Sequence, residues 1–140
     1  MLSQKTIEIV KATAPVLQNK GFEITSRMYE RLFSEYPETK VFFVNTKDGQ
    51  AERLANAVIA YAQNIENLEA LGPSVTAIAN KHVAVNVQAE HYPIVGTVLL
   101  AAMQDVLGDA ASDEVIEAWK EAYFFLAGIF IEKEQALYAG

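Results

Sequence analysis

Apolar side chains recur along almost the whole chain at intervals of three and four residues, the spacing that places them on one face of an α-helix. The first series covers residues 7–17, where Pro15 predicts a kink. A second series covers residues 22–36 and stops before Pro37, because a proline disfavours helical backbone at the preceding residue. Between the two series we expect a turn at Lys20-Gly21. This part of the chain is therefore predicted to form two helices.

Four more helical series follow, over residues 54–65, 75–82, 95–106 and 115–137. Residues that end or cap helices separate them, at Thr46–Gly49, Gly72–Ser74, Gly108 and Ser112–Glu114. Asp48 and Ser112 are the expected N-caps of the helices that follow them. No pair of strands joined by a tight turn can be read from the pattern. The sequence therefore predicts an all-α fold with six or more longer helices.

The composition is that of a compact domain without covalent cross-links. The chain has 140 residues, of which 51% are hydrophobic, so we expect a single domain over residues 1–140. The absence of cysteine excludes disulfides, thiolate metal sites, a cysteine nucleophile and thioether-linked cofactors. The net charge of −7 disfavours binding to nucleic acid, since phosphate backbones attract clustered Lys and Arg.

No targeting or membrane signal can be read from the sequence. The first five residues do not lead into an apolar run with a small-residue cleavage site, as a signal peptide requires. The longest charge-free apolar stretch, Tyr92–Met103, is shorter than the about 20 residues of a membrane-spanning helix. We therefore expect a cytoplasmic protein that does not insert into membranes.

Most motifs of catalytic sites are absent, including a glycine-rich phosphate loop, an HExxH zinc motif, a GxSxG elbow and an EF-hand loop. His82 is the exception, because it follows Ile78 by four residues and Val75 by seven and so shares their buried helix face. It is either a core histidine bonded to a neighbouring carbonyl or a metal ligand. One histidine cannot hold zinc alone, but it can hold haem iron because the porphyrin supplies four nitrogens.

Two polar residues could support His82. Tyr92 lies at the start of the next predicted helix, from where its hydroxyl could reach back to the imidazole. Glu134 lies one helical turn after Phe130 on the side expected to be buried, where a carboxylate is costly without a partner. Hydrogen bonds from these groups would orient the imidazole and increase its electron donation to a metal. The alternative for Glu134 is a surface acid, since residues 132 and 133 are also charged.

Several strings of the sequence form a recognisable set: NIENL at 64–68, Lys81-His82, HYPIVG at 91–96, and Ala118-Trp119 with Ala122-Tyr123. In these strings, and nearly end to end, the chain resembles the bacterial globins related to the haem domain of flavohaemoglobins. The resemblance implies a globin fold with its helices around a pocket for one non-covalent haem b. Flavin and nicotinamide domains follow in flavohaemoglobins, and because this chain ends at Gly140 we expect a free-standing globin.

The resemblance also implies roles for individual residues on the two sides of the haem. His82 would be the proximal iron ligand, supported by Tyr92 and Glu134. Tyr29 and Gln50 would be the distal polar residues, with the Tyr29 hydroxyl donating to bound oxygen. For Tyr29, an ordinary place in the core as a tyrosine bonded to backbone would explain the same pattern.

The remaining residues implied by the resemblance line the haem pocket: Phe43, Leu54, Lys81, Val95, Val98 and Tyr123. Phe43 would pack on the haem face, although an ordinary core position would account for it equally. Phe43, Leu54 and Val98 would form an apolar wall that limits the entry of water. Lys81 would pair with a haem propionate, for which the alternative is a solvated lysine.

Two functions follow from the resemblance, and a third reading needs no haem. The first is reversible oxygen binding, for storage, delivery or sensing. The second is a nitric oxide dioxygenase that depends on an external reductase. In either case the expected gaseous ligands are O2, NO and CO. The third is a helical interaction module without haem. A homodimer is compatible with each of these readings.

Overall fold

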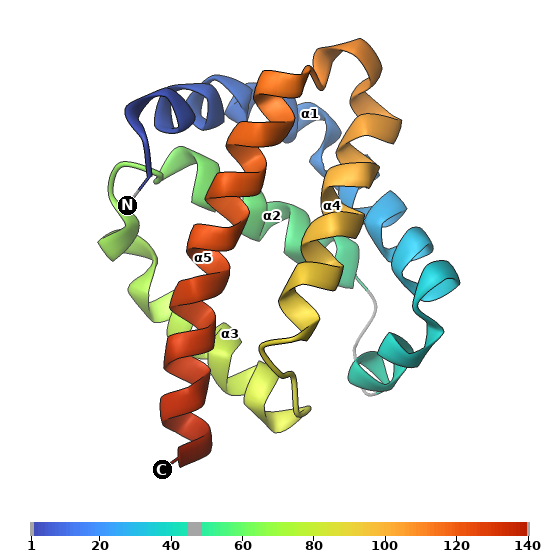
Figure 1. The fold of residues 1–140 in the computed structure, drawn as a ribbon, viewed down its shortest axis with the longest axis vertical. Coiled ribbons are helices and arrows are strands. Elements are labelled where there is room, and N and C mark those ends of the chain that lie inside the picture. Colours follow the sequence, from blue (N-terminus) through green and yellow to red (C-terminus); the bar gives the residue numbers. More distant parts are fainter. Residues whose placement is uncertain (1, 45–48, 140) are drawn as a thin grey trace.

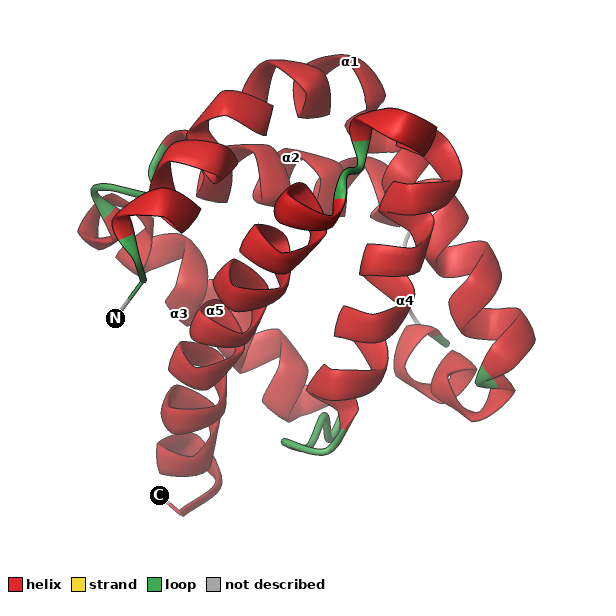
Figure 2. Ribbon diagram, turned by 45° about the horizontal axis from the view of Figure 1, so that its top comes forward, coloured by secondary structure: helices red, strands yellow, loops and turns green. Residues whose placement is uncertain are grey.

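The computed structural model describes residues 2–44 and 49–139, and this part of the chain consists of helices and short loops without a strand (Figure 2). In chain order the elements are α1 (Gln4–Glu35), η1 (Pro37–Phe43), α2 (Gln50–Gln63), η2 (Leu68–Leu71), α3 (Gly72–Ala84), α4 (His91–Leu107), η3 (Gly108–Ala110) and α5 (Asp113–Ala139). The elements marked η are 3₁₀ helices. The predicted all-α class is confirmed.

The first two predicted helices form one continuous helix, α1, of 32 residues. Ser3 caps it by accepting a hydrogen bond from the Thr6 backbone N–H at 3.2 Å, and the helix continues through Pro15. The predicted turn at Lys20-Gly21 is therefore wrong. Gly21 is buried against α2, where a Cβ would lie 3.5 Å from Ile59 Cδ1. Gly21 therefore lies in the contact between α1 and α2, and its backbone remains helical.

The buried face of α1 also differs from the predicted one. Phe22, which begins the predicted second series, is 54% exposed. The residues that enter the core are Ile24, Met28 and Leu32, which follow one another at intervals of four. Tyr29 lies beside this series and is partly buried, at the edge of the core.

The boundaries of the later helices follow local sequence signals. Gly49 occupies the N-cap position of α2 with a left-handed backbone (φ 92°), and the predicted cap Asp48 lies outside the described residues. At the start of α5, the Ser112 side chain accepts a hydrogen bond from the Val115 N–H at 3.3 Å, which confirms the predicted cap. The acidic pair Asp113-Glu114 in the first turn is favourable at the positive end of the helix dipole.

Helix α5 connects two parts of the fold (Figure 1). The helices α1, α2, α4 and α5 surround the main core, in which α1 packs against the other three. A smaller apolar cluster contains Ala79, Tyr92, Ala127 and Phe130, from α3, α4 and α5. In the described structure α3 packs against α5 and η2 and makes no backbone contact with α2 or α4. The polypeptide therefore leaves α3 separated from α2 and from most of α4.

Helix α4 is the most apolar helix of the fold. By length and composition alone, the stretch His91–Ala110 would suffice to cross a membrane. In the structure, however, Val98, Leu99 and Met103 of this helix belong to the main core, where α4 packs against α1 and α5. This packing accounts for part of the apolar character of α4, since 28% of the stretch is buried.

Candidate functional site

Three polar side chains from three helices meet near one end of α5. His82 lies near the end of α3, Tyr92 in the first turn of α4 and Glu134 near the end of α5. His82 Nδ1 lies 2.8 Å from Glu134 Oε2 and 3.0 Å from Tyr92 Oη. Tyr92 Oη also lies 2.7 Å from Glu134 Oε2 and 2.9 Å from Oε1. We refer to His82, Tyr92 and Glu134 as the proximal group.

The chemistry of the carboxylate determines the direction of these hydrogen bonds. An ionised carboxylate only accepts, so Tyr92 donates its hydroxyl hydrogen to Glu134, and His82 donates from Nδ1. In the neutral imidazole the lone pair then resides on Nε2. Burial, together with the hydrogen bond to Glu134, raises the pKa of the Tyr92 hydroxyl, so this donor stays protonated. The arrangement presents one basic imidazole nitrogen in a fixed orientation.

The burial of the proximal group is uneven. The Glu134 side chain is only 3% exposed, whereas the His82 side chain is 32% exposed. The alternative of Glu134 as a surface acid is therefore wrong, although its neighbours Glu132 and Lys133 are indeed exposed. Glu134 is enclosed by the helices and is not accessible to a ligand. The exposed part of His82 is therefore the accessible part of the proximal group.

Two further aromatic residues support Tyr92. Phe130 stacks against the Tyr92 ring at 17° and contacts the His82 ring, with a centroid distance of 5.7 Å. The Tyr123 hydroxyl donates to the Tyr92 backbone carbonyl at 2.6 Å. The Tyr123 ring lies where a Cβ on Gly96 would approach its Cε2 atom to 2.6 Å, so a larger residue there would force the ring to move. Phe130 was missing from the predicted site, although it precedes Glu134 by four residues on the same helix face.

A second polar group joins α1 and α2. Gln50 Nε2 donates to Tyr29 Oη at 3.2 Å, and Arg53 Nη2 donates to Gln50 Oε1 at 2.9 Å. The Tyr29 ring contacts Phe43, with a centroid distance of 5.4 Å. Burial raises the pKa of the Tyr29 hydroxyl, against the opposing effects of the Gln50 hydrogen bond and the Arg53 charge. We refer to Tyr29, Gln50 and Arg53 as the distal group. Arg53 was absent from the predicted site.

The predicted pocket-lining residues differ in their placement. Phe43, Leu54 and Val95 are partly buried and pack against the main core, so part of each side chain remains accessible. Lys81 is exposed. Val98 corrects our expectation, because it is 1% exposed within the main core and has no free surface for a pocket wall. Val95 lies three residues earlier on the same helix and retains such a surface.

The donor set at His82 fits a haem. Among the described residues, no cluster of three or more His, Asp or Glu side chains could hold a metal ion. A porphyrin would supply the four further nitrogen ligands of an iron bound at His82 Nε2. Partly buried apolar side chains are available on both helices, Leu54 and Val58 on α2 and Val75 and Ile78 on α3. Such side chains suit the apolar faces of a planar macrocycle.

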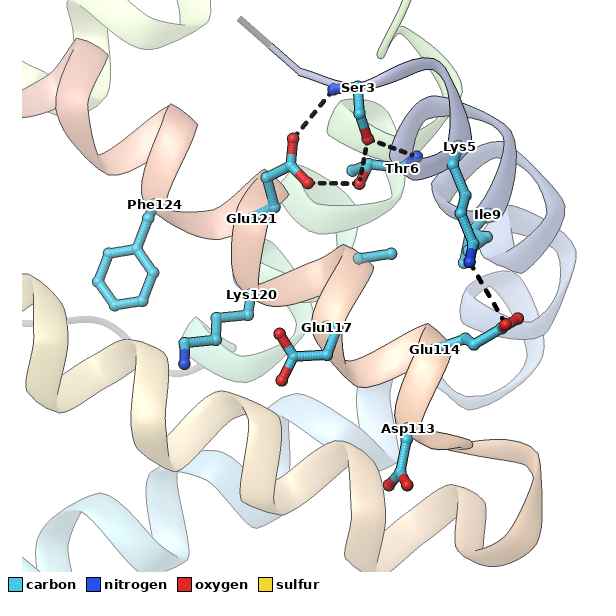
Figure 3. A pocket seen from close by; sticks show the side chains of 11 residues that line it. Ser3, Lys5, Thr6, Ile9, Asp113, Glu114, Glu117, Lys120, Glu121 and Phe124 are labelled. Atoms are coloured by element: carbon cyan, nitrogen blue, oxygen red, sulfur yellow. Dashed lines mark hydrogen bonds and ion pairs between the residues drawn. The ribbon is translucent and has the colours of Figure 1, made fainter.

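A surface pocket of about 680 Å³ lies elsewhere, between the start of α1 and the first half of α5 (Figure 3). Its polar side chains bond to one another across the two helices. Glu121 accepts hydrogen bonds from the Ser3 N–H at 2.9 Å and from the Thr6 hydroxyl at 2.6 Å, while Lys5 pairs with Glu114 at 3.4 Å. None of the predicted site residues lines this pocket, which instead joins the beginning of the chain to α5.

Comparison with known proteins supports the haem interpretation. A family model for globins matches residues 26–129. A flavohemoprotein of Halalkalibacterium halodurans is 52% identical over 98% of this chain, which spans about a third of that protein (34%). A solved structure of an engineered carbene transferase, built on a provisionally assigned nitric oxide dioxygenase of Rhodothermus marinus, has a TM-score of 0.96 and 40% identity, and the match covers 99% of this chain and 97% of that one.

The flavohemoglobin of Malassezia yamatoensis, solved with bound FAD and heme, has a TM-score of 0.88 and 30% identity. That match covers 99% of this chain and 38% of the flavohemoglobin. Together these relatives confirm the predicted resemblance and the predicted haem cofactor.

Proposed function

We propose that this chain, which belongs to the globin family, holds one haem b without a covalent bond and binds dioxygen on it reversibly. The observation that carries the proposal is the orientation of His82, whose Nδ1 is hydrogen-bonded to Glu134 at 2.8 Å. This leaves Nε2 as the one imidazole nitrogen available to bind iron. The haem supplies that iron, which would take up the gaseous ligand. His82 would be the protein's ligand to that iron.

The distal group would supply selectivity for dioxygen. A diatomic ligand that acquires partial negative charge is stabilised by a hydrogen-bond donor, by about 1–3 kcal/mol for a charge-assisted bond. Tyr29 would be that donor, and Gln50 would hold its hydroxyl in place through the 3.2 Å hydrogen bond. Phe43 and Leu54, which are both partly buried and apolar, would exclude water from the same region.

The remaining proposed contacts lie at the edges of the pocket. Val95 would contribute apolar surface from α4, while Tyr123 would act through Tyr92, because its hydroxyl is bonded to the Tyr92 carbonyl. Lys81 is exposed and directly precedes His82 in the sequence, and it would pair with a haem propionate at the surface. Such an exposed pair would contribute little, about 0–1 kcal/mol.

The burial of Glu134 favours a second function, nitric oxide dioxygenation. A buried carboxylate that accepts from His82 Nδ1 makes the imidazole a stronger electron donor, which suits activation of dioxygen as well as its carriage. In this reaction one nitric oxide, one dioxygen and one electron give one nitrate. The electron would come from an external reductase, and the FAD in the Malassezia relative supports a flavoprotein in that role. We place both functions in the cytoplasm, where such a reductase would be available.

Absorption spectra of the purified protein test the haem proposal. We expect the ferric, ferrous and carbon monoxide forms to show the distinct Soret bands of a haem with one axial histidine. A colourless preparation that fails to take up added hemin would contradict the proposal and favour a helical interaction module.

Two activity measurements separate the candidate functions. An oxygen carrier should release dioxygen unchanged when the gas is removed. A dioxygenase should consume nitric oxide steadily and form equimolar nitrate when a reductase and its electron donor are present. Nitrate formation that stops after one turnover under those conditions would exclude the second function.

A further inference from the structure

The distal group forms a chain of hydrogen bonds with a defined direction. Arg53 Nη2 donates to Gln50 Oε1 at 2.9 Å, and Gln50 Nε2 donates to Tyr29 Oη at 3.2 Å. Gln50 and Arg53 are three residues apart in the first turns of α2, which places both on one face of the helix. Tyr29 faces them from α1.

Only one of the three side chains can impose this direction. A carboxamide has an accepting oxygen and a donating nitrogen, and a hydroxyl can either accept or donate. Gln50 and Tyr29 alone could therefore pair in either sense. A guanidinium has only donors, so its hydrogen bond to Gln50 can form only through the amide oxygen, and this bond turns the amide nitrogen towards Tyr29. With Arg53 in place, the Tyr29 hydroxyl accepts from Gln50 and its own hydrogen remains free for another acceptor.

The Tyr29 hydroxyl is protonated and can donate that hydrogen. Its surroundings are apolar on one side, where Phe33 and Phe43 contact its ring at centroid distances of 5.8 and 5.4 Å. This burial raises the pKa of the hydroxyl, which therefore stays protonated at neutral pH. An acceptor that enters the proposed haem pocket beside Phe43 is thus offered a hydrogen-bond donor.

The start of α2 accommodates the guanidinium. Gly49, at the N-cap position, has a φ of 92°, which favours glycine. A Cβ at this position would lie 3.4 Å from Arg53 Nη1, closer than most Cβ contacts. Gly49 therefore leaves space beside the backbone for the Arg53 head group.

We propose that Arg53 is a positioning residue that fixes the side-chain amide of Gln50, so that Tyr29 keeps its hydroxyl hydrogen for a ligand in the haem pocket. The inference rests on the proposed function, in which Tyr29 is the distal donor. Without Arg53 the amide can rotate, and the Gln50 oxygen then accepts from Tyr29 and withdraws the hydrogen from the ligand. Arg53 would act on the ligand mainly through Gln50, beside the direct effect of its charge on the Tyr29 hydroxyl.

Carbon monoxide bound to the ferrous protein provides a direct probe of the donor. A hydrogen-bond donor near the ligand lowers the C–O stretching frequency, which infrared spectroscopy measures independently of activity. We expect Arg53→Met to add a second band at higher frequency and to accelerate dioxygen dissociation about 3- to 10-fold. Arg53→Lys retains a donor for the Gln50 oxygen and should restore the single band.

The Gln50→Leu background distinguishes orientation of the amide from a general effect of charge. With no amide to orient, Arg53→Met should change the C–O band and the dissociation rate much less in that background than in the presence of Gln50. An equal shift with and without Gln50, or no shift in Arg53→Met with haem fully bound, would overturn the proposal.

Tyr29→Phe separates failure of this inference from failure of the proposed function. If Tyr29→Phe raises the C–O frequency and Arg53→Met does not, Tyr29 is the donor and Arg53 does not position it. If neither substitution has an effect, Tyr29 is not the donor, and the distal part of the proposed function is wrong as well.

Discussion

The proximal and distal groups differ in how their polar atoms are satisfied. In the proximal group Glu134 is 2% exposed and accepts from both His82 and Tyr92, so its bonds are made within the protein. The distal group begins at Arg53, whose side chain is exposed, and ends at the partly buried Tyr29 hydroxyl. The hydrogen bonds of Glu134 in the proximal group are thus all made within the group. In the distal group, the Tyr29 hydroxyl still has a hydrogen to donate.

This difference suits the two groups to different tasks. A buried carboxylate without its partners would cost several kcal/mol, so the proximal group has one stable arrangement and holds His82 rigidly. The distal group can exchange a partner at small cost, because water can replace an exposed hydrogen bond. The proximal group would therefore hold a haem firmly. The distal group would provide an adjustable hydrogen-bond donor to a ligand on the other side of that haem. Substitutions that alter one side at a time can therefore separate the two tasks.

His82→Ala should have the largest effect, because it removes the proposed ligand to iron. We expect haem to dissociate at least about 100-fold faster, beyond the range found when only a supporting group is lost. Transfer of haem to an apoprotein acceptor measures this rate. His91→Ala is the matched control, since His91 is the only other histidine and accepts a hydrogen bond from the Gln88 N–H at the start of α4. Equal haem retention in the two variants would contradict the assignment of His82.

Tyr29→Phe should leave haem binding intact and change the ligand on the other side. Loss of the donor should accelerate dioxygen dissociation about 10- to 100-fold, which corresponds to about 1.4–2.7 kcal/mol. Stopped-flow displacement by carbon monoxide measures the rate. Tyr36→Phe, the same change at the C-cap residue that follows α1, should have no effect. A similar rate in both variants would mean that another group is the distal donor.

Helix periodicity identified His82 and Glu134 as candidates but left their alternatives open, and it did not predict the course of α1. His82 and Glu134 were found because each lies on the buried face of its own helix, and a buried polar residue requires a partner. The continuity of α1 through Gly21 could not be predicted, because the same residue type serves in turns and in close helix crossings. Ile59 of α2, against which Gly21 packs, belongs to another part of the chain.

Two further features depend on tertiary packing. Val95 and Val98 are both apolar and three residues apart on α4, so the sequence does not indicate which one enters the core and which keeps accessible surface. Arg53 reads as an ordinary exposed charge, and its position three residues after Gln50 is compatible with many side-chain conformations. Its hydrogen bond to Gln50 depends on the rotamers of both side chains.

Glu134→Gln should weaken the proximal side while preserving its shape. A glutamine can still accept from His82 Nδ1, but a neutral oxygen accepts more weakly than a carboxylate and makes the imidazole a weaker electron donor. We expect haem to dissociate about tenfold faster and the iron–imidazole stretching frequency in the resonance Raman spectrum to fall. Glu132→Gln makes the same change at an exposed position of the same helix and should alter neither quantity. An unchanged stretching frequency in Glu134→Gln would show that the carboxylate does not affect the imidazole.

Gly96→Ala should have the smallest effect and tests whether the proximal group depends on packing beneath it. The new Cβ would lie 2.6 Å from Tyr123 Cε2, so the Tyr123 ring must move and its hydrogen bond to the Tyr92 carbonyl must lengthen. Overpacking costs about 1–3 kcal/mol, and alanine recovers about 0.5–1 kcal/mol within a helix, so we expect a net loss of about 0–2.5 kcal/mol in the free energy of unfolding. Gly128→Ala on α5 is the control, because a Cβ there has no atom within 4 Å, and it should stabilise the protein by about 0.5–1 kcal/mol. Chemical denaturation of both variants gives the difference, and if Gly96→Ala proved as stable as Gly128→Ala, the contact between Tyr123 and Gly96 would not constrain Tyr92.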